Sequence, residues 1–139
     1  MGCSVFDASV VVKLVVHEPG SDHARIAFTQ ASAPLLLDWT SLEVAHALWK
    51  RTMRNQAQST EATTALESLS RLAFAEFAAA PLLESALEIA LRSRHAVYDC
   101  LYVALALVED AALVTADAKQ REVAEVAGVE VLWIDSMPG

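Results

Sequence analysis

Four acidic residues stand where a strand is predicted to end or a helix to begin. Asp7 and Asp117 each follow a short apolar run, and Glu43 and Asp99 each lie near the start of a predicted helix. Carboxylates that are removed from water need a cation or hydrogen-bond donors beside them. Ligands that offer only oxygen suit magnesium or manganese better than zinc. If the fold gathers these acids, we therefore expect them to hold a divalent metal ion.

Each acid taken alone also fits a purely structural role. Asp7 and Asp117 could cap the helices that follow them, and residues 40–43 have the pattern of a capping box. Four carboxylates at one place are harder to explain in this way, because like charges repel and raise one another's pKa. The nearest basic residues in the sequence, Lys13 and Lys119, are too few to neutralise them. The grouping therefore favours a metal site over caps alone.

The segments around these acids alternate between strand patterns and helix patterns. We predict strands at 3–6, 34–38, 113–115 and 129–134, and residues 75–80 are compatible with a further short strand. We predict helices at 8–16, 21–31, 40–55, 59–72, 81–95, 98–108 and 118–127. This alternation indicates right-handed crossovers and a mostly parallel sheet with helices on both faces, which is a three-layer α/β/α domain. Sites in such folds lie beyond the carboxyl ends of the strands, where all four acids fall.

The composition indicates one packed domain over residues 1–139, because 55% of the residues are hydrophobic and glycine and proline are few. No apolar run approaches the roughly 18 residues that cross a bilayer, and no signal peptide is visible. Cys3 and Cys100 are predicted to be reduced core residues of a cytoplasmic protein. The net charge of −8 argues against a passive coat for nucleic acids, but not against an enzyme that meets phosphates through a metal.

A few basic residues are candidates for contact with a substrate. At 100° per residue, Lys50 and Arg54 fall near the same stripe of their helix as Glu43, so a basic stripe leads away from the acids. Such a stripe could follow a nucleic-acid backbone, although a solvated helix face is the commoner explanation. Arg92 and Arg94, shortly before the helix of Asp99, are further candidates for phosphate contact.

Four segments of the chain resemble the PIN domain, in particular the VapC-type toxins of bacterial and archaeal toxin–antitoxin pairs. They are VFDAS at 5–9, SLEVAHAL at 41–48, YDCLYVALA at 98–106 and LVTAD at 113–117. The resemblance extends over essentially the whole chain, and the last two segments together are its most specific part. One departure is Asp38-Trp39, where relatives often carry an apolar residue or proline.

The resemblance implies a PIN-like endoribonuclease that depends on Mg²⁺ or Mn²⁺, with the four acids around the metal. Within that set we assign Asp7 and Asp99 as direct ligands, and the other two as ligands that bind directly or through water. Ser9 and Thr115 fall where the family often has hydroxyls that orient an acid or a water. The resemblance also implies an RNA substrate, a homodimer, and a cognate antitoxin that lays a segment across the active-site groove.

Two other functions remain open on the sequence alone. The first is a phosphoryl-transfer enzyme in which Asp7 is the nucleophile and Thr115 follows a later strand. It is weakened because Ser9 stands where such enzymes usually carry a second acid. The other is a catalytically silent PIN-like binding domain, in which the acids serve only as helix caps.

Overall fold

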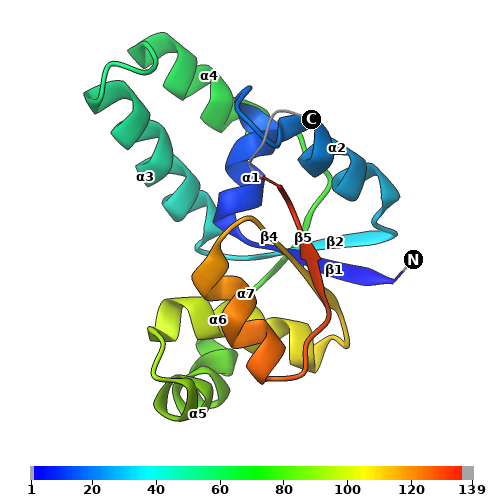
Figure 1. Ribbon diagram of the computed structural model, residues 1–139. Helices are drawn as coiled ribbons and strands as arrows, with labels where there is room; N and C mark the ends of the chain where they lie inside the picture. Colours follow the sequence, from blue (N-terminus) through cyan, green and yellow to red (C-terminus); the bar gives the residue numbers. More distant parts are fainter. Residues whose placement is uncertain (1, 136–139) are drawn as a thin grey trace.

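A parallel sheet organises residues 2–135, the part of the chain that this computed structural model describes. Its five strands lie in the order β3-β2-β1-β4-β5 (Figure 1). The strands are β1 (Cys3–Phe6), β2 (Ala33–Leu37), β3 (Ala75–Phe77), β4 (Ala112–Thr115) and β5 (Val131–Trp133). The helices are α1 (Ala8–Val15), α2 (Ser21–Gln30), α3 (Thr40–Met53), α4 (Ser59–Leu69), α5 (Leu83–Ser93), α6 (Val97–Val108), α7 (Ala118–Val126) and the short 3₁₀ helix η1 (Ala80–Leu82).

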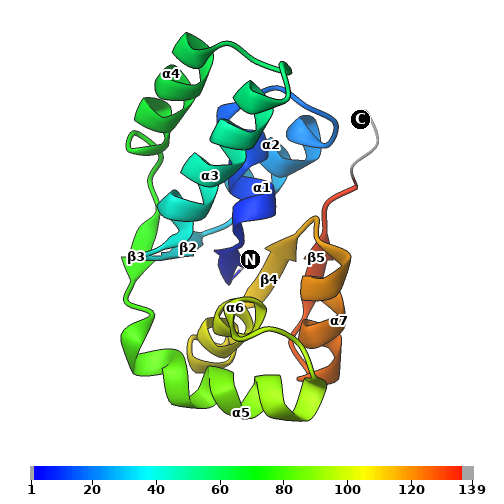
Figure 2. The ribbon, with the colours of Figure 1, turned by 90° about the vertical axis from the view of Figure 1, so that its left-hand side faces the viewer.

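Helices cover both faces of the sheet. Successive residues of each strand point to opposite faces, so each face contributes side chains to a core of its own. Val5 belongs to the core that packs on η1, α5, α6 and α7, whereas Phe6 belongs to the core that packs on α1 to α4. Leu113 and Val114 divide between the two cores in the same way. Figure 2 shows the resulting layers, with α1 to α4 above the sheet and α5 to α7 below it. The predicted three-layer α/β/α fold is thereby confirmed.

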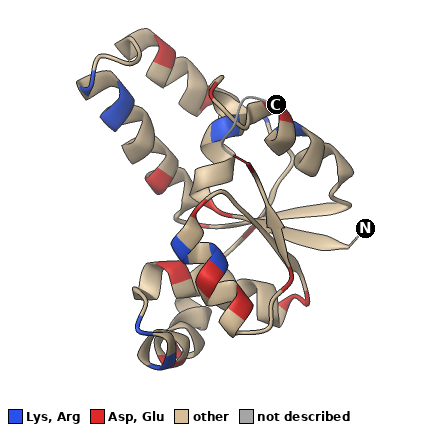
Figure 3. Cartoon of the chain, in the orientation of Figure 1, with Lys and Arg blue, Asp and Glu red and all other residues tan. Residues whose placement is uncertain are grey.

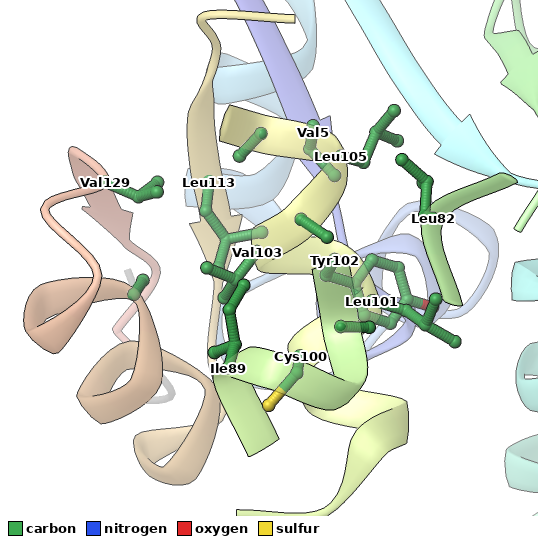
Figure 4. Close-up of a cluster of buried hydrophobic side chains, with 14 of the residues drawn as sticks. Val5, Leu82, Ile89, Cys100, Leu101, Tyr102, Val103, Leu105, Leu113 and Val129 are labelled. Atoms are coloured by element: carbon green, nitrogen blue, oxygen red, sulfur yellow. The ribbon is translucent and has the colours of Figure 1, made fainter. Parts of the chain in front are cut away.

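Helix α6 forms the centre of one layer. All residues from Cys100 to Ala106 are buried, as expected of a helix that is apolar nearly all round (Figure 4). The helix ends at Val108, and a turn with Asp110 in the left-handed conformation (φ 50°) leads into β4. Because α6 is buried on most sides, packing against its neighbours fixes the orientation of its first turn.

The strand order reverses between β1 and β4. From β1 the chain moves outward through β2 to β3, and then returns to pair β4 against the other side of β1. Strands β1 and β4 are parallel neighbours, with Phe6 opposite Val114. In open parallel sheets, ligands bind where the strand order reverses in this way, at the carboxyl ends of the strands.

The predicted elements are confirmed in type and differ in their ends. Pro81 lies in the 3₁₀ helix η1 and not in the α-helix that follows, which begins at Leu83. Helix α3 ends at Met53, because Asn55 takes the left-handed conformation (φ 57°). The ambiguous segment 75–80 provides an edge strand at its start, where Ala75 pairs with Leu35 of β2. Across residues 2–135, no helix has the length and apolar character that spanning a membrane requires.

Candidate active site

Asp7 lies at the carboxyl end of β1 and is the most buried of the four acids, with 3% of its surface exposed. Its Oδ1 accepts hydrogen bonds from the Ser9 hydroxyl (2.5 Å) and from the amide of Val10 (3.3 Å). Its Oδ2 accepts a hydrogen bond from the Thr115 hydroxyl, which comes from the end of the neighbouring strand β4 (2.5 Å). Asp7 is therefore both the N-cap of α1 and a carboxylate bonded to the neighbouring strand β4.

Burial raises the pKa of Asp7 from its usual 3.8 to about 7. The hydrogen bonds from Ser9, Thr115 and Val10 act in the opposite direction, because they stabilise the ionised form, and the charge of Asp117 raises the pKa further. The predicted supporting hydroxyls thus both contact this acid. A cation bound beside Asp7 would lower this pKa again, because it would stabilise the ionised carboxylate.

Glu43 reaches the same edge from the first turn of α3. The hydroxyl of Tyr102 donates a hydrogen bond of 2.6 Å to its Oε1, and the same hydroxyl lies 3.1 Å from the Thr40 hydroxyl. Burial raises the pKa of Glu43, and the charges of Asp99 and Asp117 raise it further. The expected capping box of residues 40–43 is wrong: Trp39 is the N-cap residue and makes no side-chain cap, because Thr40 is buried against Tyr102.

Asp99 and Asp117 complete the set. Asp99 lies in the first turn of α6, and burial together with the charge of Asp117 raises its pKa. Asp117 follows β4 as the N-cap of α7, and its Oδ1 accepts the amide of Lys119 at 2.9 Å. The side chain of Gln120, itself almost fully buried, donates a hydrogen bond of 2.6 Å to the backbone oxygen of Asp99. This bond ties the start of α6 to α7.

The four acids share one electrostatic environment although they come from four separate segments. The charge of Asp117 raises the pKa of each of the other three, and Asp99 also acts on Glu43. Asp7 and Asp117 come from the ends of adjacent strands, Glu43 from the helical layer above the sheet and Asp99 from the layer below. The fold therefore brings all four predicted acids to one edge, within reach of each other's charge.

These acids are not arranged as a finished metal cage. In residues 2–135, no group of three or more His, Cys, Asp or Glu side chains is positioned to hold an ion as it stands. Their oxygens instead accept protein hydrogen bonds, as described for Asp7 and Glu43. The set nevertheless fits a hard divalent cation, because it consists of carboxylates, and burial and repulsion raise the pKa values of Asp7, Glu43 and Asp99.

Basic side chains near the site leave the acids largely uncompensated. Lys13 is buried, but its ammonium group donates to Glu18 (3.0 Å) and to the backbone oxygen of Pro19 (2.8 Å). His95 and Lys119 lower the pKa of Asp99 at a distance, less than burial and Asp117 raise it. Among the described residues, none of the four acids forms an ion pair with lysine or arginine. The site therefore carries excess negative charge that a bound cation would neutralise.

An open groove of about 800 Å³ runs along α3, and Glu43 is the one of the four acids that lines it. It is lined by Ala8, Ser9, Val12, Trp39, Leu42, Glu43, His46, Ala47, Lys50 and Tyr98. Figure 3 shows the change of charge along α3, which is acidic at the end beside the sheet and basic toward its other end. Lys50 therefore shares a groove with Glu43, as the stripe predicts, whereas Arg54 follows the last turn of α3 as its exposed C-cap residue.

The remaining predicted contacts lie elsewhere. Arg92 borders a separate small pocket between α5, α6 and α7, together with Ser93 and Val126. Arg94 is the exposed C-cap residue of α5, in the left-handed conformation (φ 63°). Asp38 is an exposed turn residue whose Oδ1 accepts the amide of Ala79 at 3.2 Å.

Sequence reasoning missed two residues that contact the predicted acids. Tyr102 follows Asp99 by three residues, and Gln120 follows Asp117 by three, so each lies about one helical turn beyond an acid. That spacing was available as a signal. The hydrogen-bond partners could not be predicted from the sequence, because Tyr102 donates to an acid on another helix and Gln120 donates to a backbone oxygen on another helix.

Known proteins resemble this chain in sequence and in fold. The family model of the PIN domain matches residues 4–126. Ribonuclease VapC3 of Pyrobaculum aerophilum is 37% identical over 120 residues, which are 85% of this chain and 92% of that protein.

Three solved structures share the fold. PAE2754 from Pyrobaculum aerophilum superposes with a TM-score of 0.72 at 22% identity, over 92% of this chain and 82% of that chain. VapBC2 from Rickettsia felis, bound to a DNA fragment from its promoter, superposes with a TM-score of 0.64 at 11% identity, over 96% of this chain and 99% of that chain. A toxin–antitoxin complex from Klebsiella pneumoniae superposes with a TM-score of 0.61 at 14% identity, over 98% of this chain and 99% of that chain.

Proposed function

Because this chain belongs to the PIN-domain family, we propose that it is a metal-dependent endoribonuclease, and that it is the toxin of a toxin–antitoxin pair. One observation supports this proposal above the others: four acids from separate segments meet where the strand order reverses, without lysine or arginine paired to them among residues 2–135. The relative of 37% identity is named a ribonuclease. We take the whole chain, residues 1–139, as one nuclease domain in the cytoplasm.

We assign the side chains distinct roles in this reaction. Asp7 and Asp99 bind Mg²⁺ or Mn²⁺ directly, and Glu43 and Asp117 bind it directly or through water. When bound, the ion lowers the pKa of the attacking water and neutralises charge on the phosphoryl oxygens. Ser9 and Thr115 hold the Asp7 carboxylate in one orientation by hydrogen bonds to both of its oxygens. Fixed ligands of this kind keep water and phosphate in line for attack.

The alternative in which Asp7 attacks phosphorus itself predicts a different product. A phosphoryl group would be trapped on Asp7, and small phosphomonoesters would release phosphate. The alternative of a silent binding domain predicts no metal binding, and titration calorimetry with Mn²⁺ distinguishes it from the nuclease.

We further propose that the groove along α3 accepts RNA during cleavage and an antitoxin segment during inhibition. The groove combines apolar side chains, such as Leu42 and Tyr98, with the carboxylate of Glu43. An apolar protein segment that carries a basic side chain would match this surface, because the cation would meet the uncompensated carboxylates. Two of the structures with the same fold are described as toxin–antitoxin assemblies.

A homodimer through α5 is the last part of the proposal. Leu83, Leu87 and Leu91 recur every four residues along this helix, and they are 50%, 49% and 73% exposed. One continuous apolar stripe on a single helix can pair with its own copy about a two-fold axis, which is the commonest symmetry of homo-oligomers.

The decisive test compares single substitutions in an RNA cleavage assay with Mg²⁺. Asp7→Asn and Asp99→Asn keep the shape of the side chain and remove a charge, so we expect folded proteins with cleavage reduced at least about 100-fold. Asp22→Asn, an exposed acid on α2 that pairs with Arg25, is the matched control and is expected to cleave normally. Cleavage at the wild-type rate by either site variant would refute the ligand assignment. Sequencing the RNA ends would also identify the target.

A further inference from the structure

We propose that Tyr102 is a positioning residue, whose hydroxyl holds Glu43 in the orientation that the metal site requires. The inference rests on the proposed function and concerns a residue that the metal-ligand set does not include. Tyr102 Oη lies 2.6 Å from Glu43 Oε1 and 3.1 Å from Thr40 Oγ1. It thus sits between two residues of the first turn of α3, although it belongs to α6 in the opposite layer.

The direction of these hydrogen bonds follows from the number of protons available. A phenol carries one hydrogen, and an ionised carboxylate can only accept, so Tyr102 donates to Glu43. The Thr40 hydroxyl must then donate to Tyr102, which fills the accepting position of the phenol oxygen. The result is an ordered chain from Thr40 through Tyr102 to Glu43, with every donor directed toward the acid.

The tyrosine is rigid enough for this role. It is 3% exposed, its ring lies 5.5 Å from the ring of Trp39 at 42°, and it is part of the core below the sheet (Figure 4). Thr40 is fully buried. A glutamate on the first turn of a helix has three rotatable bonds, and nothing in its own helix fixes them. Glu43 therefore takes its orientation from the rigid layer on the other side of the sheet.

The bond has a specific consequence for the site. It occupies Oε1 of Glu43, whereas Oε2 accepts no hydrogen bond from residues 2–135, in a region where Asp99 and Asp117 repel the charge. Without the phenol, repulsion would favour a rotamer that turns the carboxylate into the open groove beside Lys50. Groups that orient metal-binding carboxylates typically change metal affinity about 10- to 100-fold when they are removed.

The test measures Mn²⁺ binding by titration calorimetry, without RNA. Tyr102→Phe keeps the packed ring and removes only the hydroxyl, so we expect Mn²⁺ binding about 10-fold weaker than in the wild type. Thr63→Val is the control, because it removes an exposed hydroxyl of α4 that donates only to backbone oxygens of its own helix (3.4 and 3.1 Å); its Mn²⁺ affinity should equal that of the wild type. In a Glu43→Gln background, Tyr102→Phe should have no additional effect, because the group that it orients has lost its charge.

Thermal unfolding without metal separates this role from a merely structural one, since a packing residue would lower the melting temperature and leave the Mn²⁺ affinity of the folded protein unchanged. Thr40→Val removes the hydroxyl at which this row of hydrogen bonds begins, and it should weaken Mn²⁺ binding less than Tyr102→Phe does. It serves as the test if Tyr102→Phe does not fold. Wild-type affinity in the folded variants would overturn the inference. Absence of Mn²⁺ binding in the wild type would instead refute the proposed function.

Discussion

At the scale of single residues, Asp7 shows how the site opposes the stability of the fold. The carboxyl is buried at the end of β1, and burial raises its pKa to about 7 despite hydrogen bonds from Ser9, Thr115 and Val10. An apolar residue there would remove the cost of ionisation, but it would bind no cation. The pKa values of Glu43 and Asp99 are raised for the same first reason, which is burial.

This arrangement makes the metal-free protein less stable at high pH. The folded pKa of Asp7 lies above the unfolded value of 3.8, so its contribution is fully present below pH 4 and is lost as the pH rises through about 7. Over that interval the free energy of unfolding should fall by up to about 4 kcal/mol from this group alone. Thermal melts between pH 5 and pH 8 in the presence of a chelator measure the effect, and saturating Mn²⁺ should reverse most of it at pH 8.

Asp7→Asn provides the control for the same measurement. The amide cannot ionise, so the variant should show a flatter pH profile and a higher melting temperature than the metal-free wild type at pH 8. A wild-type slope in the variant would mean that another group causes the pH dependence.

At the scale of elements, α3 links Glu43 to the surface that we propose binds RNA. Its first turn carries Glu43 beside the sheet, and its basic residues stand toward the far end (Figure 3). Lys50 lines the groove that begins at Glu43. One straight helix thus sets the distance between the metal site and the phosphate contacts that we propose.

We expect Lys50→Ala combined with Arg54→Ala to weaken the binding of single-stranded RNA by about 10-fold at low salt, because two phosphate contacts are lost. Fluorescence anisotropy in the Asp7→Asn background measures binding without cleavage. The Mn²⁺ affinity of the double variant, measured with Asp7 intact, should not change. Arg25→Ala with Arg71→Ala removes the same charge from exposed positions outside α3 and is the control. Equal RNA affinity in the two double variants would disprove a specific role for α3.

At the scale of the whole molecule, the strand order determines where the acids meet. Asp7 and Asp117 adjoin because β1 and β4 are neighbours, although 110 residues separate the two acids in the sequence (117 − 7). The helical layers then contribute one acid each, from α3 above and from α6 below (Figure 2). Loss of packing in either layer would therefore remove one acid from the site.

The proposed dimer makes a prediction at this scale. Sedimentation of the wild type should give twice the 15.0 kDa mass of one chain, and Leu87→Asp with Leu91→Asp should give a single chain. Both leucines are exposed in the chain described here, so the substitutions should leave the fold intact. Ile26→Asp, at an exposed position on α2, is the control and should sediment like the wild type. A monomeric wild type would contradict the dimer and leave the nuclease proposal unaffected.

Much of the fold could be predicted from the sequence, because local patterns carry it. The alternation of strands and helices follows from apolar periodicity and from breakers such as Gly20 and Gly128, which both adopt positive φ. Element ends were less predictable. The helix predicted from Pro81 begins with a 3₁₀ turn, and Thr40 turns inward to Tyr102 in place of capping its helix. Tertiary contacts decide such ends, since a few neighbouring residues allow several alternatives.

The sequence by itself determined which residues have the chemistry for a metal site and where along the chain they stand, because carboxylates at strand ends and helix starts are local facts. Only the tertiary structure decided which side chains contact these carboxylates. The hydroxyls of Ser9 and Thr115 converge on Asp7 from two strands, Tyr102 reaches Glu43 from the opposite layer, and Lys13 is drawn away by Glu18. These partners depend on the side-by-side packing of distant segments, which no local pattern encodes.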